Sequence, residues 1–281
     1  MVGSAARHEQ RGVRWVPPIV AARDPQRGAM STGVAVLGGT AGVGLETAAQ
    51  FAEQGARVVI LGRNDARGQS AREHVLARAA NCDVSFVRVD AADPHDAMRA
   101  EAECRALLGS IDVLMNTTGP RDHPRLLHTI PIETVQQRIT EIILPPLHMM
   151  QAVLPAMRDN RSGSIINVAS DAAKVATPGE TLIGAAMAAI VMFSKAAALE
   201  VKREGVRINV LTPSLISDTP GAALIGSDPF SAKLFEKAAA MAHLGVATPD
   251  DLASMALYLA SPAAARITGQ AISINGGISV G

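Results

Sequence analysis

Glycines recur at short intervals in the segment Gly38-Gly39-Thr40-Ala41-Gly42-Val43-Gly44. The segment follows an apolar run at residues 34–37 and precedes residues with helical apolar spacing. Such a turn leaves backbone N–H groups at the start of a helix free to meet phosphate, at the positive end of the helix dipole. Gly38 would permit the tight turn, Gly42 the approach of phosphate, and Gly44 the close packing of helix on strand. The pattern predicts dinucleotide binding, with a turn kept only for packing as the alternative.

The end of the next apolar run indicates which dinucleotide is bound. This run, at residues 57–61, is followed by Gly62-Arg63-Asn64. An acidic residue at such a place accepts hydrogen bonds from the ribose 2′-hydroxyl of NAD, whereas a basic one pairs with the 2′-phosphate of NADP. The guanidinium of Arg63 offers a planar fork of donors suited to phosphate. We therefore predict NADP(H), with NAD(H) less favoured and supported only by Asp65.

The elements that would position these residues alternate along the chain. Runs typical of strands are 34–37, 57–61, 84–89, 111–115, 164–168, 206–211 and 271–274. Segments with helical apolar spacing are 45–54, 65–79, 94–108, 132–157, 181–203 and 249–260. Strands that are apolar at nearly every position are buried on both faces. The sequence therefore predicts one α/β domain, with a doubly wound, seven-stranded parallel sheet and helices on both faces.

Composition restricts the partners. The chain has 26 basic and 26 acidic side chains and no Lys/Arg cluster. This balance does not favour nucleic acid or an anionic membrane, so a small molecule is the expected partner. Cys82 and Cys104 form neither a CxxC pair nor a metal-ligand spacing, which predicts no metal site and two free thiols in the cytoplasm. We expect no apolar stretch of the roughly 20 residues that span a bilayer.

Residues 1–29 differ in composition from the rest of the chain. Arginines are spread among Gly, Pro and Ala, and Pro17-Pro18 interrupts the only apolar run. A secretory signal needs an unbroken apolar core, so that interpretation fails, and Glu9 and Asp24 weaken a transit-peptide interpretation. We expect a poorly ordered leader at 1–29 and a single folded domain at 30–281.

Further short segments follow the glycine turn in a fixed order. They are Asp90-Ala91, Asn116-Thr117-Thr118-Gly119, residues 164–170, residues 206–210, Ile267-Thr268-Gly269-Gln270 and Asn275-Gly276-Gly277. Together with the turn, they resemble the short-chain dehydrogenase/reductase family over residues 33–281. The resemblance implies a Rossmann-type fold and an oxidoreductase that uses a nicotinamide cofactor.

The resemblance also implies where the cofactor binds. Asp90 and Ala91 would flank the adenine. Asn116 would line the central groove, and the backbone near Ile216 would meet the nicotinamide carboxamide. The predicted cofactor-binding residues are Gly38, Thr40, Val43, Gly44, Arg63, Asp90, Ala91, Asn116, Gly119 and Ile216.

The catalytic residues that the resemblance implies are largely replaced. Aligning Ser170 with the family's serine places its tyrosine at Ile183 and its lysine at Met187, and its asparagine falls near Ile142. In the family the phenol donates a proton to the carbonyl oxygen, while the ammonium lowers the phenol's pKa. Ile and Met can do neither, and losing a general acid costs about a hundred- to ten-thousand-fold in rate. The one tyrosine, Tyr258, is expected to pack in the core.

Substitute groups would have to come from nearby loops or from the helix at 132–157. Charged residues follow Ser170 and the Asn116 turn, with solvated loop charges as the alternative: Asp171, Lys174, Arg121, Asp122 and His123. Pro145-Pro146 should kink the helix just before His148 and free two backbone carbonyls, which predicts a remnant proton relay.

These observations favour an atypical NADP(H)-dependent oxidoreductase, with Ser170 as its remaining catalytic residue. A non-redox enzyme on the same fold, such as a cyclase, isomerase or eliminase, and a catalytically silent nucleotide-binding subunit are the alternatives. The segment 219–244 resembles the family's mobile lid and carries Met and Phe, which predicts a small, mainly apolar substrate. The small-residue helix at 184–199 predicts a homodimer or homotetramer.

Overall fold

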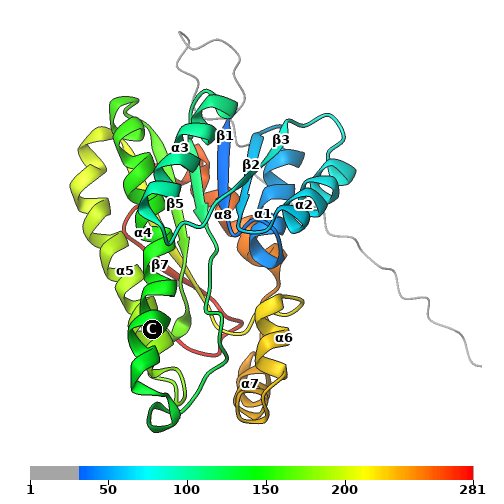
Figure 1. Ribbon diagram of the computed structural model, residues 1–281, viewed down its shortest axis with the longest axis vertical. Coiled ribbons are helices and arrows are strands. Elements are labelled where there is room, and N and C mark those ends of the chain that lie inside the picture. Colours follow the sequence, from blue (N-terminus) through cyan, green and yellow to red (C-terminus); the bar gives the residue numbers. More distant parts are fainter. Residues whose placement is uncertain (1–31, 281) are drawn as a thin grey trace, which may run out of the picture.

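A seven-stranded parallel sheet organises the protein (Figure 1). The structure, a computed structural model, describes residues 32–280, so the leader predicted at 1–29 lies outside the described residues. The strands are β1 (Gly33–Leu37), β2 (Arg57–Gly62), β3 (Val84–Arg88), β4 (Val113–Asn116), β5 (Gly163–Val168), β6 (Val206–Pro213) and β7 (Ala271–Ile274). Their order, β3-β2-β1-β4-β5-β6-β7, reverses direction between β1 and β4. The predicted doubly wound parallel sheet is confirmed.

Helices cover both faces of this sheet. They are α1 (Gly42–Glu53), α2 (Asp65–Arg78), α3 (Pro94–Leu108), α4 (Val135–Asp159), α5 (Thr181–Val201), α6 (Pro220–Gly226), α7 (Pro229–Met241) and α8 (Pro249–Ala260). Alternate residues of β1 enter opposite cores, because successive side chains of a strand point to opposite faces. Val34 and Val36 pack in the cluster that contains Phe51 of α1, whereas Ala35 and Leu37 pack with α3 and α4. Each face is therefore sealed by its own helices.

Local sequence signals fix where several helices begin. Asn64 and Asp93 accept hydrogen bonds from backbone N–H groups of α2 and α3, and Thr248 forms a reciprocal capping box with Asp251 at the start of α8. The predicted α3, α8 and β7 agree with the structure at both ends, and the other predicted elements differ by a few residues.

Two helices were not predicted. The segment expected to be a lid contains α6 and α7, which lie together at the lower right of Figure 1, apart from the helices that cover the sheet. Each begins with a capping side chain followed by proline, at Thr219-Pro220 and Asp228-Pro229. A capping residue followed by proline is a sequence signal for the start of a helix. The Gly and Ser residues within this segment made the signal harder to recognise.

The two adjacent prolines of α4 do not end the helix. The helix runs without a break over Val135–Asp159, with Pro145, Pro146 and Pro155 inside it. The relay through the freed carbonyls stays a prediction, and the Nδ1 atom of His148 is paired with the backbone oxygen of Ala91 at 2.9 Å. This pairing holds the loop after β3 in place.

The expectation that no apolar stretch is long enough to cross a membrane is wrong for α5. With the turn that follows it, Thr181–Glu204 forms 24 helical residues that pass this test by length and composition, and 33% of the apolar window is buried. Many residues of this helix are alanines, so its apolar character is less evident in the sequence than a run of larger apolar residues would be. The helix packs on α4 and on β6, and its outer side carries Met192 and Leu199, which are 65% and 66% exposed.

Candidate active site

A cleft of about 670 Å³ lies at the carboxyl ends of the strands, where the strand order reverses between β1 and β4. Open parallel sheets bind ligands at this place, because the loops that leave neighbouring strands diverge there. The volume suits a ligand of dinucleotide size or a smaller one. The predicted site residues that line it are Gly38, Thr40, Val43, Arg63, Asp90, Ala91, Gly119, Ser170, Ile183, Met187 and Ile216.

The glycine turn forms one wall of the cleft and depends on having no side chains. Gly38 and Gly42 have φ angles of +77° and +51°, which other residues rarely adopt. A Cβ atom on Gly44 would lie 2.4 Å from the backbone oxygen of Gly38, so helix α1 could not pack this closely on β1. Gly44 therefore lies behind the lining, in the packing role that the sequence predicted for it. The turn is free to receive a phosphate at the first turn of α1.

Threonines after β4 complete the middle of the cleft. Thr117 donates its hydroxyl proton to the backbone oxygen of Leu37 at 2.7 Å, which ties this loop to the glycine turn. Thr118 also lines the cleft, and its buried Oγ1 atom has no hydrogen-bond partner within residues 32–280. A buried hydroxyl without a partner carries a desolvation cost that a bound polar ligand removes. The residues of this wall fit a nicotinamide dinucleotide.

Asn116 does not line the cleft. Its side-chain amide donates to Asn167 at 2.7 Å, and Asn167 donates to the hydroxyl of Ser194 at 2.8 Å. These residues form a buried polar network that joins β4, β5 and α5 beneath the site. Its role is to position the strand ends. The sequence did carry a signal for this network, because Asn116 and Asn167 are polar residues within otherwise apolar strands.

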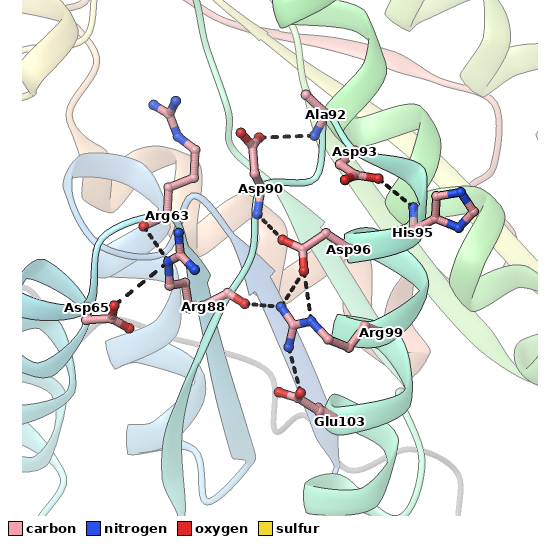
Figure 2. A network of polar contacts seen from close by, with 10 residues as sticks. All are labelled: Arg63, Asp65, Arg88, Asp90, Ala92, Asp93, His95, Asp96, Arg99 and Glu103. Atoms are coloured by element: carbon pink, nitrogen blue, oxygen red, sulfur yellow. Dashed lines mark hydrogen bonds and ion pairs between the residues drawn. The ribbon is translucent and has the colours of Figure 1, made fainter.

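Arg63 and Asp90 line one end of the cleft, and a network of charged side chains surrounds them (Figure 2). Arg88 donates to the backbone oxygen of Arg63 at 3.3 Å and lies 3.8 Å from a carboxylate oxygen of Asp65. The exposed side chain of Arg63 points away from this pair, and within the described part of the chain its guanidinium makes no ion pair. The Asp90 backbone N–H donates to Asp96, which holds the loop after β3 in place.

The other end of the cleft is hydrocarbon. Ile183 and Met187 lie one turn apart on α5 and both line the cleft. Met187 is buried in a cluster with Ile190 and Ile142, so Ile142 lies behind the lining. The polar group among them is Ser170, whose oxygen accepts a hydrogen bond from the Ala172 backbone at 3.2 Å. Its hydroxyl proton remains available to a ligand.

Two carboxylates beside Ser170 also line the cleft. Asp171 is buried and accepts hydrogen bonds from Ser279 and Asn275 through Oδ2, while its Oδ1 atom has no partner among residues 32–280. Glu180 lies at the start of α5, and burial together with the charge of Asp171 raises its pKa to about 7, against the opposing effect of Thr177. Sequence reasoning did not single out Glu180, because the burial of its side chain is not visible in the local pattern.

Most of the other charged candidates are engaged elsewhere. Arg138 lies 2.9 Å from Asp122, and His123 lies 3.6 Å from Asp228. Arg121 does line the cleft, and its guanidinium lies 3.7 Å from the Glu141 carboxylate. The remaining candidate, the ammonium of Lys174, donates to the hydroxyl of Ser273.

Other titratable groups are remote from the cleft lining. Tyr258 is half-buried against the core, as expected. Cys82 and Cys104 are free thiols, and burial raises the pKa of Cys104 to about 12, which makes it a poor nucleophile. Within residues 32–280, no group of three His, Cys, Asp or Glu side chains could hold a metal ion.

Comparison with known proteins supports an oxidoreductase. Residues 38–279 match a family model described as enoyl-(acyl carrier protein) reductase. The chain is 34% identical over 248 residues to 3-oxoacyl-(acyl-carrier-protein) reductase FabG of Chlamydia pneumoniae, covering 88% of this chain and 96% of that protein. It is also 34% identical over 246 residues to 2,5-dichloro-2,5-cyclohexadiene-1,4-diol dehydrogenase LinX of Sphingobium indicum, covering 88% and 95% of the two chains.

Solved structures give the same result. The NADPH-dependent reductase YwfH, involved in bacilysin biosynthesis, superposes with a TM-score of 0.81 at 25% identity, covering 89% of this chain and 99% of that one. An actinorhodin polyketide ketoreductase solved with NADPH has a TM-score of 0.81 at 26% identity, covering 88% and 97%. The cleft, the glycine turn and these similarities agree, and the chain belongs to the short-chain dehydrogenase/reductase family of oxidoreductases.

Proposed function

We propose that the protein is an NADP(H)-dependent oxidoreductase that acts on a small, mainly apolar substrate without the family's tyrosine and lysine pair. The observation that carries this proposal is the single continuous cleft. Its first end combines an open glycine turn with the guanidinium of Arg63, and its second end presents Ile183 and Met187 beside Ser170. One bound dinucleotide would reach from one end to the other.

The preference for NADP(H) rests on charge at the first end. Asp65 is the acid nearest to the end of β2, and its carboxylate is directed toward Arg88. Arg63 remains to pair with a 2′-phosphate in the bidentate manner that guanidinium groups favour. YwfH is described as NADPH-dependent, and the actinorhodin ketoreductase was solved with NADPH, which supports the same choice here.

The apolar character of the substrate follows from the walls of the second end. The lid segment contributes apolar side chains from α6 and α7, and α5 adds its own hydrocarbon groups. The apolar residues of this end are Val175, Ile183, Met187, Ile225, Leu234, Phe235 and Met241. Such walls reward the burial of hydrocarbon on a ligand.

The chain's own groups orient the reactants. The nicotinamide, when bound, supplies a hydride to the substrate carbon. Ser170 can donate its hydroxyl proton as a hydrogen bond to the substrate's heteroatom. Ile183 and Met187 exclude water from the same region, which strengthens the electrostatic interactions within it. A substrate that is already activated, such as an iminium ion or a conjugated acceptor, would require the least help from the protein.

Titration with NADPH and NADH tests this proposal. Tight binding of NADPH, weaker binding of NADH and consumption of bound NADPH on addition of apolar ketones or imines are expected. Tight binding without consumption would favour a non-redox enzyme, because the hydrocarbon groups near Ser170 also suit a shaped pocket for cyclisation, isomerisation or elimination. If NADPH is consumed only when another protein is present, the chain would be a catalytically silent nucleotide-binding subunit.

We also propose that the protein forms a homodimer or homotetramer in the cytoplasm. Met192 and Leu199 leave apolar area uncovered on the outer side of α5, which lies at the left edge of Figure 1. A second copy of the same helix would cover this area symmetrically. The two free thiols suit a reducing compartment. Sedimentation of the wild type and of a Met192→Lys variant tests the assembly.

A further inference from the structure

Glu180 has an unusual position for an acidic residue. Its backbone oxygen accepts a hydrogen bond from Gly184 at 2.6 Å, so it begins the turn of α5 that carries Ile183. Glu180, Ile183 and Ser170 all line the cleft. The carboxyl group therefore belongs to the hydrocarbon end of the site, where no phenol is present.

The surroundings of Glu180 favour its protonated form. Burial is the main cause, and the negative charge of Asp171 adds to it, so that the pKa is raised to about 7. The other charged groups that line the cleft are placed differently: Arg121 pairs with Glu141 from α4, Lys237 comes from α7, and Arg63 and Asp90 lie at the nucleotide end. Within residues 32–280, no ion pair with a cation offsets the burial of Glu180.

Other groups in this end are less suited to give up a proton. The Asp171 carboxylate is already engaged, because its Oδ2 atom accepts hydrogen bonds from Ser279 and Asn275. The Ser170 hydroxyl is a hydrogen-bond donor, but its proton is too weakly acidic to transfer without a neighbouring base. Glu141 lies beside the guanidinium of Arg121.

We propose that Glu180 is the proton donor of this enzyme, in place of the family's phenol. The inference rests on the proposed NADP(H)-dependent reduction. The substrate carbon of a C=O or C=N bond receives hydride, and the π electrons move to the heteroatom. The heteroatom takes the carboxyl proton of Glu180 and becomes a hydroxyl or amine. Glu180 is left as a carboxylate and recovers its proton from water through the open cleft.

The first test needs no substrate and no cofactor. Glutamate side chains labelled with ¹³C at the carboxyl carbon are titrated by NMR in the wild type and in Glu180→Gln. One resonance is expected to titrate near pH 7 in the wild type and to be missing from the variant. The inference is overturned if that resonance remains in the variant, or if no glutamate titrates in this range. The exposed Glu73→Gln, on α2, is the control and should keep the resonance.

The second test measures binding and turnover separately. Glu180→Gln should bind NADPH within about twofold of the wild type and lose about a hundredfold in the rate of reduction of apolar ketones. The wild-type rate should fall above about pH 7, while the residual rate of the variant should not. Glu180→Asp should restore part of the rate. A preformed iminium salt, which needs no proton, should be reduced at a similar rate by both proteins.

The outcomes separate the two proposals. A wild-type chain that binds no NADPH would contradict the proposed function, whatever the NMR titration shows. A wild type that consumes NADPH with ketones, together with a Glu180→Gln variant of equal rate and equal pH profile, would overturn the role of Glu180 alone.

Discussion

The two ends of the cleft differ in what their side chains supply. The end that we propose for the nucleotide offers backbone conformation and one guanidinium, through the glycines at 38 and 42 and through Arg63. At the reaction end, Met187 is buried in a hydrocarbon cluster with Ile142, which also packs against Ile183. Both ends lie at the same edge of the sheet but are formed by different loops and helices. Residues at one end can therefore be substituted without altering the other end.

Under the proposed function, cofactor binding and proton transfer would depend on separate sets of residues. The glycine turn tolerates little change, because each glycine is constrained by its φ angle or by backbone at close range. Helix α5 tolerates apolar replacements, since hydrocarbon at 183 and 187 packs with the cluster behind it. A chain can therefore keep the cofactor site while its chemistry changes.

The largest expected effect comes from rebuilding the reaction end. The triple variant Ile142→Asn, Ile183→Tyr, Met187→Lys should gain about a hundred- to ten-thousand-fold in the reduction of simple ketones, because it restores a phenol and an ammonium beside Ser170. The rate of NADPH consumption is the measurement. No gain in a folded variant that binds NADPH would show that further parts of this end have diverged.

The single variant Met187→Lys is the matched control. Its ammonium would replace a buried thioether that packs beside Ile142 and Ile190. We expect it to lower the free energy of unfolding by about 3–5 kcal/mol, as for an unpaired buried charge. Chemical denaturation measures this loss of unfolding free energy, and we expect a smaller loss in the triple variant. Equal losses in both would contradict the view that these positions act as one cluster.

The nucleotide end is tested by comparing two glycines. Gly42→Ala and Gly55→Ala place alanine at φ angles of +51° and +80°, so each should cost about 1 kcal/mol or more of stability. Gly42 lines the cleft, whereas nothing lies within 4 Å of a Cβ atom on Gly55. Only Gly42→Ala should also weaken NADPH binding, by about a hundredfold, equal to roughly 2.7 kcal/mol. Calorimetric titration distinguishes them, and equal affinities would contradict phosphate binding at this turn.

Sequence reasoning predicted the nucleotide end better than the reaction end. The glycine turn, its strand and its helix lie next to one another in the chain, so local spacing is sufficient to place them. The fold was predicted for the same reason, since β-branched runs and helical spacing alternate in order. Arg63 could be placed at the cleft because it directly follows β2, and its role toward the cofactor stays a prediction.

The reaction end depends on contacts between distant segments. The burial that raises the pKa of Glu180 exists only in the folded protein, and no local pattern reports it. Asn116 was placed in the cleft, although its partner Asn167, 51 residues away, draws it into the core. The resemblance identified which groups were missing but not which residue could replace them.

A smaller effect concerns the stability contributed by Glu180. Its pKa is about 7 when folded, above the ordinary 4.5, so the folded state binds the proton more tightly. The resulting stabilisation is full below about pH 4.5 and is lost as the pH rises through 7. Because the carboxyl is half-buried, we expect a loss of about 2 kcal/mol. Relative to the wild type, Glu180→Gln should gain this amount between pH 5 and 8 in urea denaturation, while Glu73→Gln should not.

The smallest expected effect is on the choice of cofactor. Arg63→Gln removes the guanidinium but keeps a side chain of similar polarity, so NADPH affinity should fall about tenfold, or roughly 1.4 kcal/mol. NADH has no 2′-phosphate, and its affinity should stay the same. Arg67→Gln, exposed on the first turn of α2, controls for the loss of one positive charge nearby. Since Arg88 is directed toward Asp65, it cannot take the place of Arg63 without giving up that partner. An equal loss for NADPH and NADH would mean that Arg63 contacts the shared part of the dinucleotide, and the nucleotide end would then hold the cofactor without selecting it.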